Sequence, residues 1–214
     1  MPVTRRELVI SASCLALVAA IGLPMPAHAE DDVDMAKVLE PSPLGDIALG
    51  KKDAPVTIVE YASMTCGHCG HFTNDVLPIV KEKYIDTGKV RYILRDFPLD
   101  NVAAAITLLA RCQGGEKYYP MVEMFFQQQK NWITAKDMKG AIFNLAKQAG
   151  FTQESFEACI GDQKLLDEVQ AVRDRAAKEF GVNSTPTFFI NGERIVGALP
   201  AEEFTKIIDK HLQA

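Results

Sequence analysis

Two cysteines lie three residues apart in the segment Cys66-Gly67-His68-Cys69. They follow an apolar, β-branched run at residues 56–62, so we expect the pair at the point where a strand ends and a helix begins. A thiol becomes a nucleophile only as the thiolate, and the free N–H groups and positive dipole of a helix N-terminus stabilise that anion. We therefore expect Cys66 to be the attacking sulfur. Cys69, one turn later on the same helix face, can close a disulfide with Cys66 or resolve a mixed disulfide.

Metal binding is the alternative use of such a pair. A C-x-x-C segment also serves as half of a structural zinc site or as a Cu(I) site. Tetrahedral zinc needs two further ligands, and His68, His71 and His211 are available, but the chain has neither a second C-x-x-C pair nor an H-x₃-H pair. Redox chemistry without a bound metal or other cofactor is therefore the preferred interpretation, and a metal-binding module without turnover is the alternative.

The first 29 residues have the three parts of a secretory signal: Arg5-Arg6, an apolar stretch at 8–23 and the cleavage-site pattern Ala27-His28-Ala29. Export is expected, by the Sec or the twin-arginine route. Cleavage after Ala29 would leave 185 of the 214 residues, which is enough for one sizeable core.

The chain that follows this signal is acidic and keeps four cysteines. It has 21 Lys and Arg against 27 Asp and Glu and no basic block, so we expect no nucleic-acid partner. Four cysteines permit three pairings, and the short spacing favours Cys66 with Cys69, which leaves Cys112 with Cys159. Two buried free thiols at positions 112 and 159 are the alternative.

The elements expected around the cysteines describe an α/β fold. Alternating and apolar runs predict strands at 55–62, 89–95, 187–190 and 194–196, the last two joined by the tight turn Asn191-Gly192. Helical periodicity predicts four or five helices within 103–112, 118–130, 135–150, 153–159 and 165–181, and a closing helix at 201–212.

Two departures from regular structure are also expected. Pro78 should bend the helix that follows the cysteines or interrupt its hydrogen bonds. Residues 30–54 are polar and rich in Pro and Gly, which predicts a loosely held N-terminal segment with one short strand at 46–49 and little chemistry.

Two separated motifs give the chain a family resemblance. Residues 60–69 (EYASMTCGHC) and 182–188 (VNSTPTF), with the helical segment between them, resemble the DsbA-like branch of the thioredoxin superfamily. The resemblance covers nearly all of the chain after residue 29 and implies a thioredoxin fold with an inserted all-helical domain. The implied parts are a signal peptide (1–29), an N-terminal extension (30–54), a thioredoxin-like domain (55–100 and 182–214) and a helical insertion domain (101–181).

The resemblance implies a periplasmic thiol:disulfide oxidoreductase. It would donate its disulfide to reduced or unfolded exported proteins, be re-oxidised by a DsbB-type membrane oxidase, bind no cofactor and act as a monomer. Thr185 resembles the threonine of related isomerases and departs from the valine of the best-known oxidase, so disulfide isomerase or reductase is the alternative. Isomerases usually carry an N-terminal dimerisation domain, for which the 25 residues 30–54 are too few.

The resemblance also implies roles for the cysteines and for the histidine between them. Cys66 matches the exposed nucleophile and Cys69 the buried resolving thiol, while His68 matches the histidine that helps to stabilise the Cys66 thiolate. A solvated turn histidine is the alternative for His68. Cys112 and Cys159 resemble the second disulfide of some alphaproteobacterial DsbA proteins.

Three further positions follow from the resemblance. Pro186 matches a cis-proline that faces the disulfide, and Thr185 before it would present its backbone to an extended substrate. Glu60 matches a buried glutamate that takes the proton from Cys69 during turnover. A buried carboxylate needs a partner, for which Arg95 is the candidate, and a solvent-facing Glu60 at a strand edge is the alternative.

Overall fold

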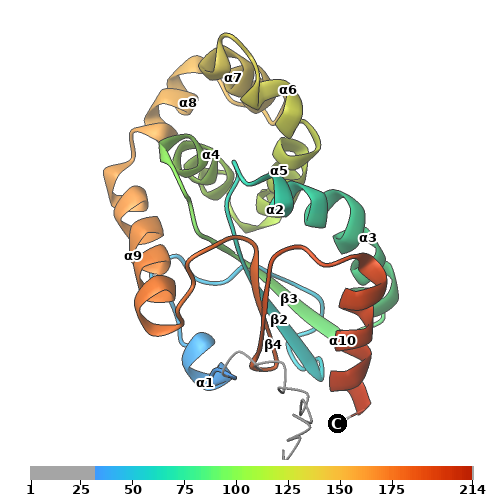
Figure 1. Cartoon of the computed structure of the whole chain (residues 1–214). Coiled ribbons are helices and arrows are strands. Elements are labelled where there is room, and N and C mark those ends of the chain that lie inside the picture. The colour runs from blue at the N-terminus through green and yellow to red at the C-terminus, as the bar shows by residue number, and fades with distance from the viewer. Residues whose placement is uncertain (1–31, 214) are drawn as a thin grey trace, which may run out of the picture.

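The computed structural model describes residues 32–213, so the predicted signal segment lies outside the described residues. Its centre is a five-stranded sheet with the order β1-β3-β2-β4-β5 (Figure 1). The strands are β1 (Ala48–Leu49), β2 (Val56–Ala62), β3 (Val90–Asp96), β4 (Thr187–Ile190) and β5 (Glu193–Val196). Only β2 and β3 pair in parallel, and every other neighbouring pair is antiparallel.

Strand β2 lies in the middle of the sheet and ends four residues before Cys66. Six of its seven residues are buried, which explains why its sequence is nearly continuous in apolar residues and does not alternate. A parallel partner requires a crossover connection, and the helical segment that starts at Cys66 provides it. The predicted unit of strand, helix and strand is therefore present.

This crossover helix is irregular. It consists of α2 (Gly67–His71), the π-helical turn η1 (Phe72–Val76), α3 (Leu77–Val80) and the π-helical turn η2 (Lys81–Ile85). Pro78 lies in the first turn of α3, directly after η1. Proline has no N–H to donate, so the predicted interruption of the hydrogen bonding is present at this position.

The segment between β3 and β4 contains helices joined by short loops and no strand. Its six helices are α4 (Asn101–Cys112), α5 (Gly115–Gln127), α6 (Gln129–Ile133), α7 (Met138–Gln148), α8 (Gln153–Ile160) and α9 (Gln163–Glu179). The prediction of four or five helices was one short, because the expected helix at 118–130 divides at Gln128 into α5 and α6. Gly114, with φ of 79°, precedes α5 and lets the chain turn after α4.

Figure 1 shows where these helices lie. Helices α4 to α8 gather beyond the end of the sheet at which α2 begins, whereas α9 runs back along one side of the sheet. The closing helix α10 (Ala201–Gln213) and α3 lie on the other side. One continuous apolar cluster joins the α10 side of the sheet to the helical region, through side chains such as Phe72, Tyr92 and Phe125. The helical region is thus packed directly against the elements that hold the cysteines.

Cys112 and Cys159 form a disulfide, as predicted. Their Cα atoms lie 6.2 Å apart, and the bond joins the end of α4 to α8 across 47 residues of sequence. No helix of residues 32–213 is long and apolar enough to cross a membrane.

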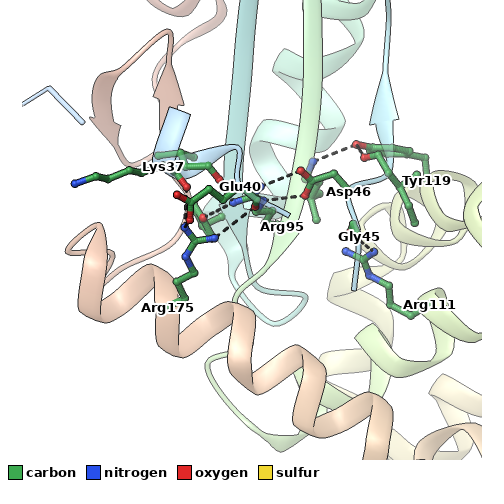
Figure 2. A network of polar contacts seen from close by, with 12 residues as sticks. Lys37, Glu40, Gly45, Asp46, Arg95, Arg111, Tyr119 and Arg175 are labelled. Carbon is green, nitrogen blue, oxygen red and sulfur yellow. Dashed lines mark hydrogen bonds and ion pairs between the residues drawn. The ribbon is translucent and has the colours of Figure 1, made fainter. Parts of the chain in front are cut away.

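The prediction of a loosely held N-terminal segment was wrong. The guanidinium of Arg95, on β3, donates two hydrogen bonds of 2.9 Å to the carboxylate of Asp46 and another to the carbonyl of Val38. Arg175, on α9, binds the carbonyl of Lys37 at 2.8 Å and the carboxylate of Glu40 at 2.6 Å. Figure 2 shows these two arginines pointing from the sheet and from α9 toward this segment.

Burial explains why this segment is held. The side chain of Arg95 is only 4% exposed, and a buried cation is tolerated only when partners satisfy its N–H groups. Residues 38 and 46 supply those partners, and helix α1 (Met35–Val38) and β1 are kept in place by the same contacts. Polar groups of this segment accept hydrogen bonds from the buried Arg95 guanidinium, and the composition of the segment alone does not indicate these contacts.

Candidate active site

Cys66 occupies the N-cap of α2, after a three-residue loop (63–65) that follows the end of β2 at Ala62. Its backbone is extended, with φ of −78° and ψ of 119°, and its carbonyl accepts the first bond of the helix from the Gly70 N–H at 3.1 Å. The Cys66 side chain is half-buried, whereas Cys69, in the first turn, is fully buried. The predicted placement of the pair at the change from strand to helix is confirmed, with both thiols free in this structure.

The site stabilises Cys66 as an anion. Hydrogen bonding from the Cys69 thiol is the largest influence, and together with the N–H groups of Cys69 and His68 it outweighs burial. These groups lower the pKa of Cys66 from an ordinary 9.0 to about 5. In its protonated form the thiol instead donates to the carbonyl of Thr185, 3.2 Å away.

Cys69 is affected in the opposite direction. Burial is the main cause that raises the pKa of its thiol well above the usual 9.0, and the hydrogen bond to Cys66 and the charge of Glu60 act in the same sense. The two thiols therefore differ in the form they favour: Cys66 is a thiolate near neutral pH, and Cys69 keeps its proton. Such a division is typical of a pair whose members have different chemical roles.

The loop before β4 faces Cys66. The Thr185-Pro186 peptide bond is cis, as predicted. Thr187 Oγ1 donates to Ser184 O at 2.8 Å, and the Gly197 N–H donates to Pro186 O at 2.8 Å, so contacts on both sides hold this turn. The arrangement places the Thr185 backbone against the sulfur of Cys66.

Glu60 is fully buried in β2, and the alternative of a solvent-facing strand edge was wrong. One carboxylate oxygen accepts a hydrogen bond from the Tyr92 hydroxyl, and the other has no partner among residues 32–213. Burial raises the pKa of Glu60 to about 8, the Tyr92 hydroxyl opposes this rise, and the charge of Cys66 adds to it.

Arg95, the predicted partner of Glu60, lies on the other face of the sheet. In the parallel register Arg95 is opposite Tyr61, whose hydroxyl accepts from its guanidinium at 3.0 Å. Neighbouring residues of a strand point to opposite faces, so the side chain next to Tyr61 in sequence, Glu60, points away from Arg95. Tyr92, three residues earlier in β3, is on the correct face and donates to the carboxylate.

The comparisons with known proteins agree with this geometry. A model of the thioredoxin family matches residues 42–210. A crystal structure of alpha-DsbA1 from Wolbachia pipientis superposes with a TM-score of 0.75 at 34% identity, over 83% of this chain and 95% of that one. The chain belongs to the DsbA-like branch of the thioredoxin family. The predicted α/β fold, a thioredoxin fold with an added helical region, is confirmed.

Curated relatives of this DsbA-like chain are more distant. A Rickettsia bellii protein with protein-disulfide oxidoreductase in its name is 31% identical over 148 residues, which is 69% of this chain and 57% of that protein. Disulfide bond formation protein D of Bacillus subtilis is 25% identical over 81% of this chain and 80% of that one. The DsbA-like chain thus spans less than two thirds of the length of the Rickettsia protein.

Tyr92→Phe tests the environment of Glu60. The substitution removes the only hydrogen-bond donor to this carboxylate that the described residues show, so we expect the pKa of Glu60 to rise above its value of about 8. A hydrogen bond to a charged group is worth about 1.5–3 kcal/mol, which corresponds to a rise of roughly one to two pKa units. Carbon-13 NMR of the labelled carboxyl group against pH measures it.

Tyr84→Phe is the matched control for that experiment. Tyr84 donates to Asp209 at 2.9 Å, so its loss removes a tyrosine–carboxylate bond elsewhere and should leave the titration of Glu60 unchanged. An unaltered Glu60 midpoint in Tyr92→Phe would show that the tyrosine hydroxyl does not influence this carboxylate.

Sequence reasoning missed three polar residues of the site. Thr65 Oγ1 donates to Asp100 Oδ2 at 2.6 Å, which links the loop before Cys66 to the N-cap of α4. Gln129, on α6, donates to two carbonyls of the same loop. Thr65 and Gln129 carry no sequence signal, because they act on residues at least 35 positions away. Asp100 does carry one, since it is a typical N-cap residue that accepts from the Ala103 N–H.

No three His, Cys, Asp or Glu side chains between residues 32 and 213 come together in a group that could hold a metal ion.

Proposed function

We propose that this protein is a protein-disulfide oxidoreductase that introduces disulfides into exported proteins by dithiol–disulfide exchange through Cys66 and Cys69. The observation that carries the proposal is the difference in pKa and in burial between the Cys66 and Cys69 thiols. A half-exposed sulfur with a pKa of about 5 faces the Thr185-Pro186 turn, and a buried thiol that retains its proton lies behind it. Relatives named as a protein-disulfide oxidoreductase and as a disulfide bond formation protein support the same chemistry.

The transfer begins with the oxidised enzyme, in which Cys66 and Cys69 share a disulfide. A substrate thiolate attacks Sγ of Cys66, the bond to Cys69 breaks, and Cys69 leaves as a thiolate that takes up a proton. A second substrate thiolate then attacks the substrate sulfur of the mixed disulfide, and Cys66 departs as a thiolate. The substrate loses two electrons to form its disulfide, and the enzyme gains them as a dithiol.

The acidity of Cys66 favours transfer of the disulfide from the enzyme to the substrate. A sulfur of low pKa is a good leaving group, and its thiolate stabilises the reduced enzyme, so the enzyme disulfide is a strong oxidant. The Thr185-Pro186 turn would align an extended substrate beside the sulfur, since the Thr185 carbonyl is already within 3.2 Å of it. The His68 N–H contributes to the stabilisation of the thiolate, and we propose that its imidazole, which is exposed, adds to it.

Re-oxidation requires the proton of Cys69 to leave again. Glu60 is a candidate for the base that accepts this proton, because its charge acts on the buried Cys69 and its pKa of about 8 allows both protonation states near neutral pH. We propose that a DsbB-type membrane oxidase accepts the electrons, and that the protein works as a monomer in the periplasm after removal of residues 1–29.

The reduction potential of the Cys66–Cys69 pair tests the proposal directly. We expect a value clearly more oxidising than the glutathione pool of the cytosol, which lies at about −220 to −260 mV by extraction. Equilibration with glutathione buffers, followed by alkylation and mass measurement, gives the potential. A pair as reducing as that pool would contradict the oxidase.

The thiolate content of the reduced protein should depend on pH in a defined window. The folded pKa of Cys66, about 5, lies below its ordinary value of 9.0. Stabilisation of the reduced form by the thiolate is therefore complete above pH 9, weakens as the pH falls, and is lost below about pH 5. Ultraviolet absorbance of the thiolate against pH measures this, and a midpoint near the ordinary thiol value would remove the physical basis of the oxidase.

Isomerase or reductase activity is the second candidate, and the observation that favours it is the threonine before the cis-proline. The redox state inside the cell distinguishes the two. An oxidised Cys66–Cys69 pair, trapped by acid and counted by a gel shift, supports the oxidase, whereas a reduced pair supports the isomerase.

A further inference from the structure

A glutamine of the helical region reaches the loop that carries Cys66. Gln129, the first residue of α6, is 8% exposed. Its side-chain Nε2 donates to the carbonyl of Met64 at 2.9 Å and to that of Cys66 at 3.0 Å. These contacts span 65 and 63 residues of sequence, so they tie the helical region to the start of α2.

Both carbonyls lie in the loop whose conformation places the Cys66 sulfur beside the N-terminus of α2. The Cys66 carbonyl already accepts the first helical bond from Gly70, and the amide of Gln129 gives it a second donor. A carbonyl oxygen carries partial negative charge, and a donor on that oxygen reduces its repulsion of a neighbouring thiolate. The same bonds hold the backbone of Cys66 at the angle from which the N–H groups of His68 and Cys69 reach the sulfur.

Gly70 provides the space for this amide. A Cβ at residue 70 would lie 2.7 Å from Oε1 of Gln129 and 3.3 Å from its Cδ. Gly70 is buried within α2 and does not have a positive φ, so its backbone does not require glycine, and alanine would favour the helix. The absence of a side chain at residue 70 is therefore explained by the position of Gln129.

We propose that Gln129 is a positioning residue for the Cys66 sulfur: from the helical region it holds the carbonyls of Met64 and Cys66 so that α2 presents its N–H groups to that sulfur. The inference rests on the proposed function, which it deepens. The helical region, which lies between β3 and β4 in sequence, then becomes part of the redox centre. One of its side chains helps to determine the reduction potential of the Cys66–Cys69 disulfide.

Gln129→Met is the direct test, because methionine has nearly the same volume and no N–H. We expect the thiolate midpoint of Cys66 to rise by about one unit, a tenfold loss in stabilisation of the reduced form, which corresponds to a potential about 30 mV more negative. Gln129→Glu replaces the donors with negative charge and should shift both quantities further in the same direction. Cys69, Glu60 and His68, the other titratable groups near the sulfur, are unchanged in both variants.

Gly70→Ala is a second route to the same result. It leaves Gln129 in the sequence but pushes its amide away from the two carbonyls, so we expect a smaller shift of the same sign. If Gln129→Met does not fold, as judged by circular dichroism and thermal unfolding, the Gly70→Ala titration decides the matter. Gln127→Met is the matched control, since Gln127 is exposed at the end of α5 and should titrate like the parent.

The inference is overturned if folded Gln129→Met titrates with the parent midpoint, or if Gln127→Met shifts it equally. The thiolate titration needs only the reduced protein and no substrate, so it is independent of disulfide transfer. A parent protein that fails to oxidise substrates would contradict the proposed function, whereas a normal midpoint in Gln129→Met and Gly70→Ala would contradict the positioning role alone.

Discussion

A Cys66→Ala variant is expected to oxidise reduced substrates no faster than the uncatalysed background. Every covalent step of the proposed transfer passes through Sγ of Cys66, as the atom attacked and later as the leaving group. Cys69 cannot replace it, because this thiol is fully buried and its pKa is raised above the ordinary value, so almost no accessible thiolate exists near neutral pH. The loss is therefore complete.

Oxidative refolding of a reduced protein with known disulfides measures this loss. Cys69→Ala is the informative companion, because it keeps the acidic nucleophile and removes only the resolving thiol. We expect this variant, when activated at Cys66, to remain joined to substrate as a mixed disulfide that a non-reducing gel detects. Oxidative refolding at the parent rate by Cys66→Ala would end the proposed mechanism.

Removal of the second disulfide should produce the largest change in stability. Cys112→Ala with Cys159→Ala opens a loop of 47 residues, and the chain entropy regained by the unfolded state predicts a loss of up to about 4 kcal/mol in the free energy of unfolding. For a protein of this size each kcal/mol lowers Tm by roughly 2–4 °C, so the full 4 kcal/mol would lower Tm by about 8–16 °C.

Denaturant unfolding of the double variant and its parent measures the difference. Both proteins should carry Cys66→Ala, so that the active-site pair does not contribute to either curve. We expect a lower midpoint and a larger dependence on denaturant, since the unfolded chain expands when the cross-link is absent. Equal midpoints would mean that the bond between α4 and α8 constrains the unfolded chain too little to matter.

The local features of the site were predictable because they depend on near neighbours in sequence. The apolar run before Cys66 predicted the strand, and the spacing of Cys66 and Cys69 predicted a pair on one helix face. The cis form of Pro186 was also predicted, but only through the family resemblance, since most X-Pro bonds are trans. The helical region was found from its period, except for the break at Gln128.

The partner of Glu60 shows where such reasoning fails. A carboxylate in an apolar strand predicts burial and the need for a partner, and both expectations were correct. Arg95 was the wrong partner because the choice depends on the register of β2 and β3, in which a shift by one residue moves a side chain to the other face. The sequence does not contain that register in any local pattern.

The amino-acid sequence by itself determined the cysteine pair on which the proposed chemistry depends, the strand and helix next to it and the family to which the chain belongs. Only the tertiary structure decided which distant groups contact the site, Tyr92 on Glu60 and Gln129 on the Cys66 carbonyl, and which residues satisfy the buried Arg95 on the other face of the sheet. The reason is physical. Secondary structure follows from interactions within a few residues, whereas the pKa of a buried group depends on desolvation and on donors brought from distant parts of the chain by packing.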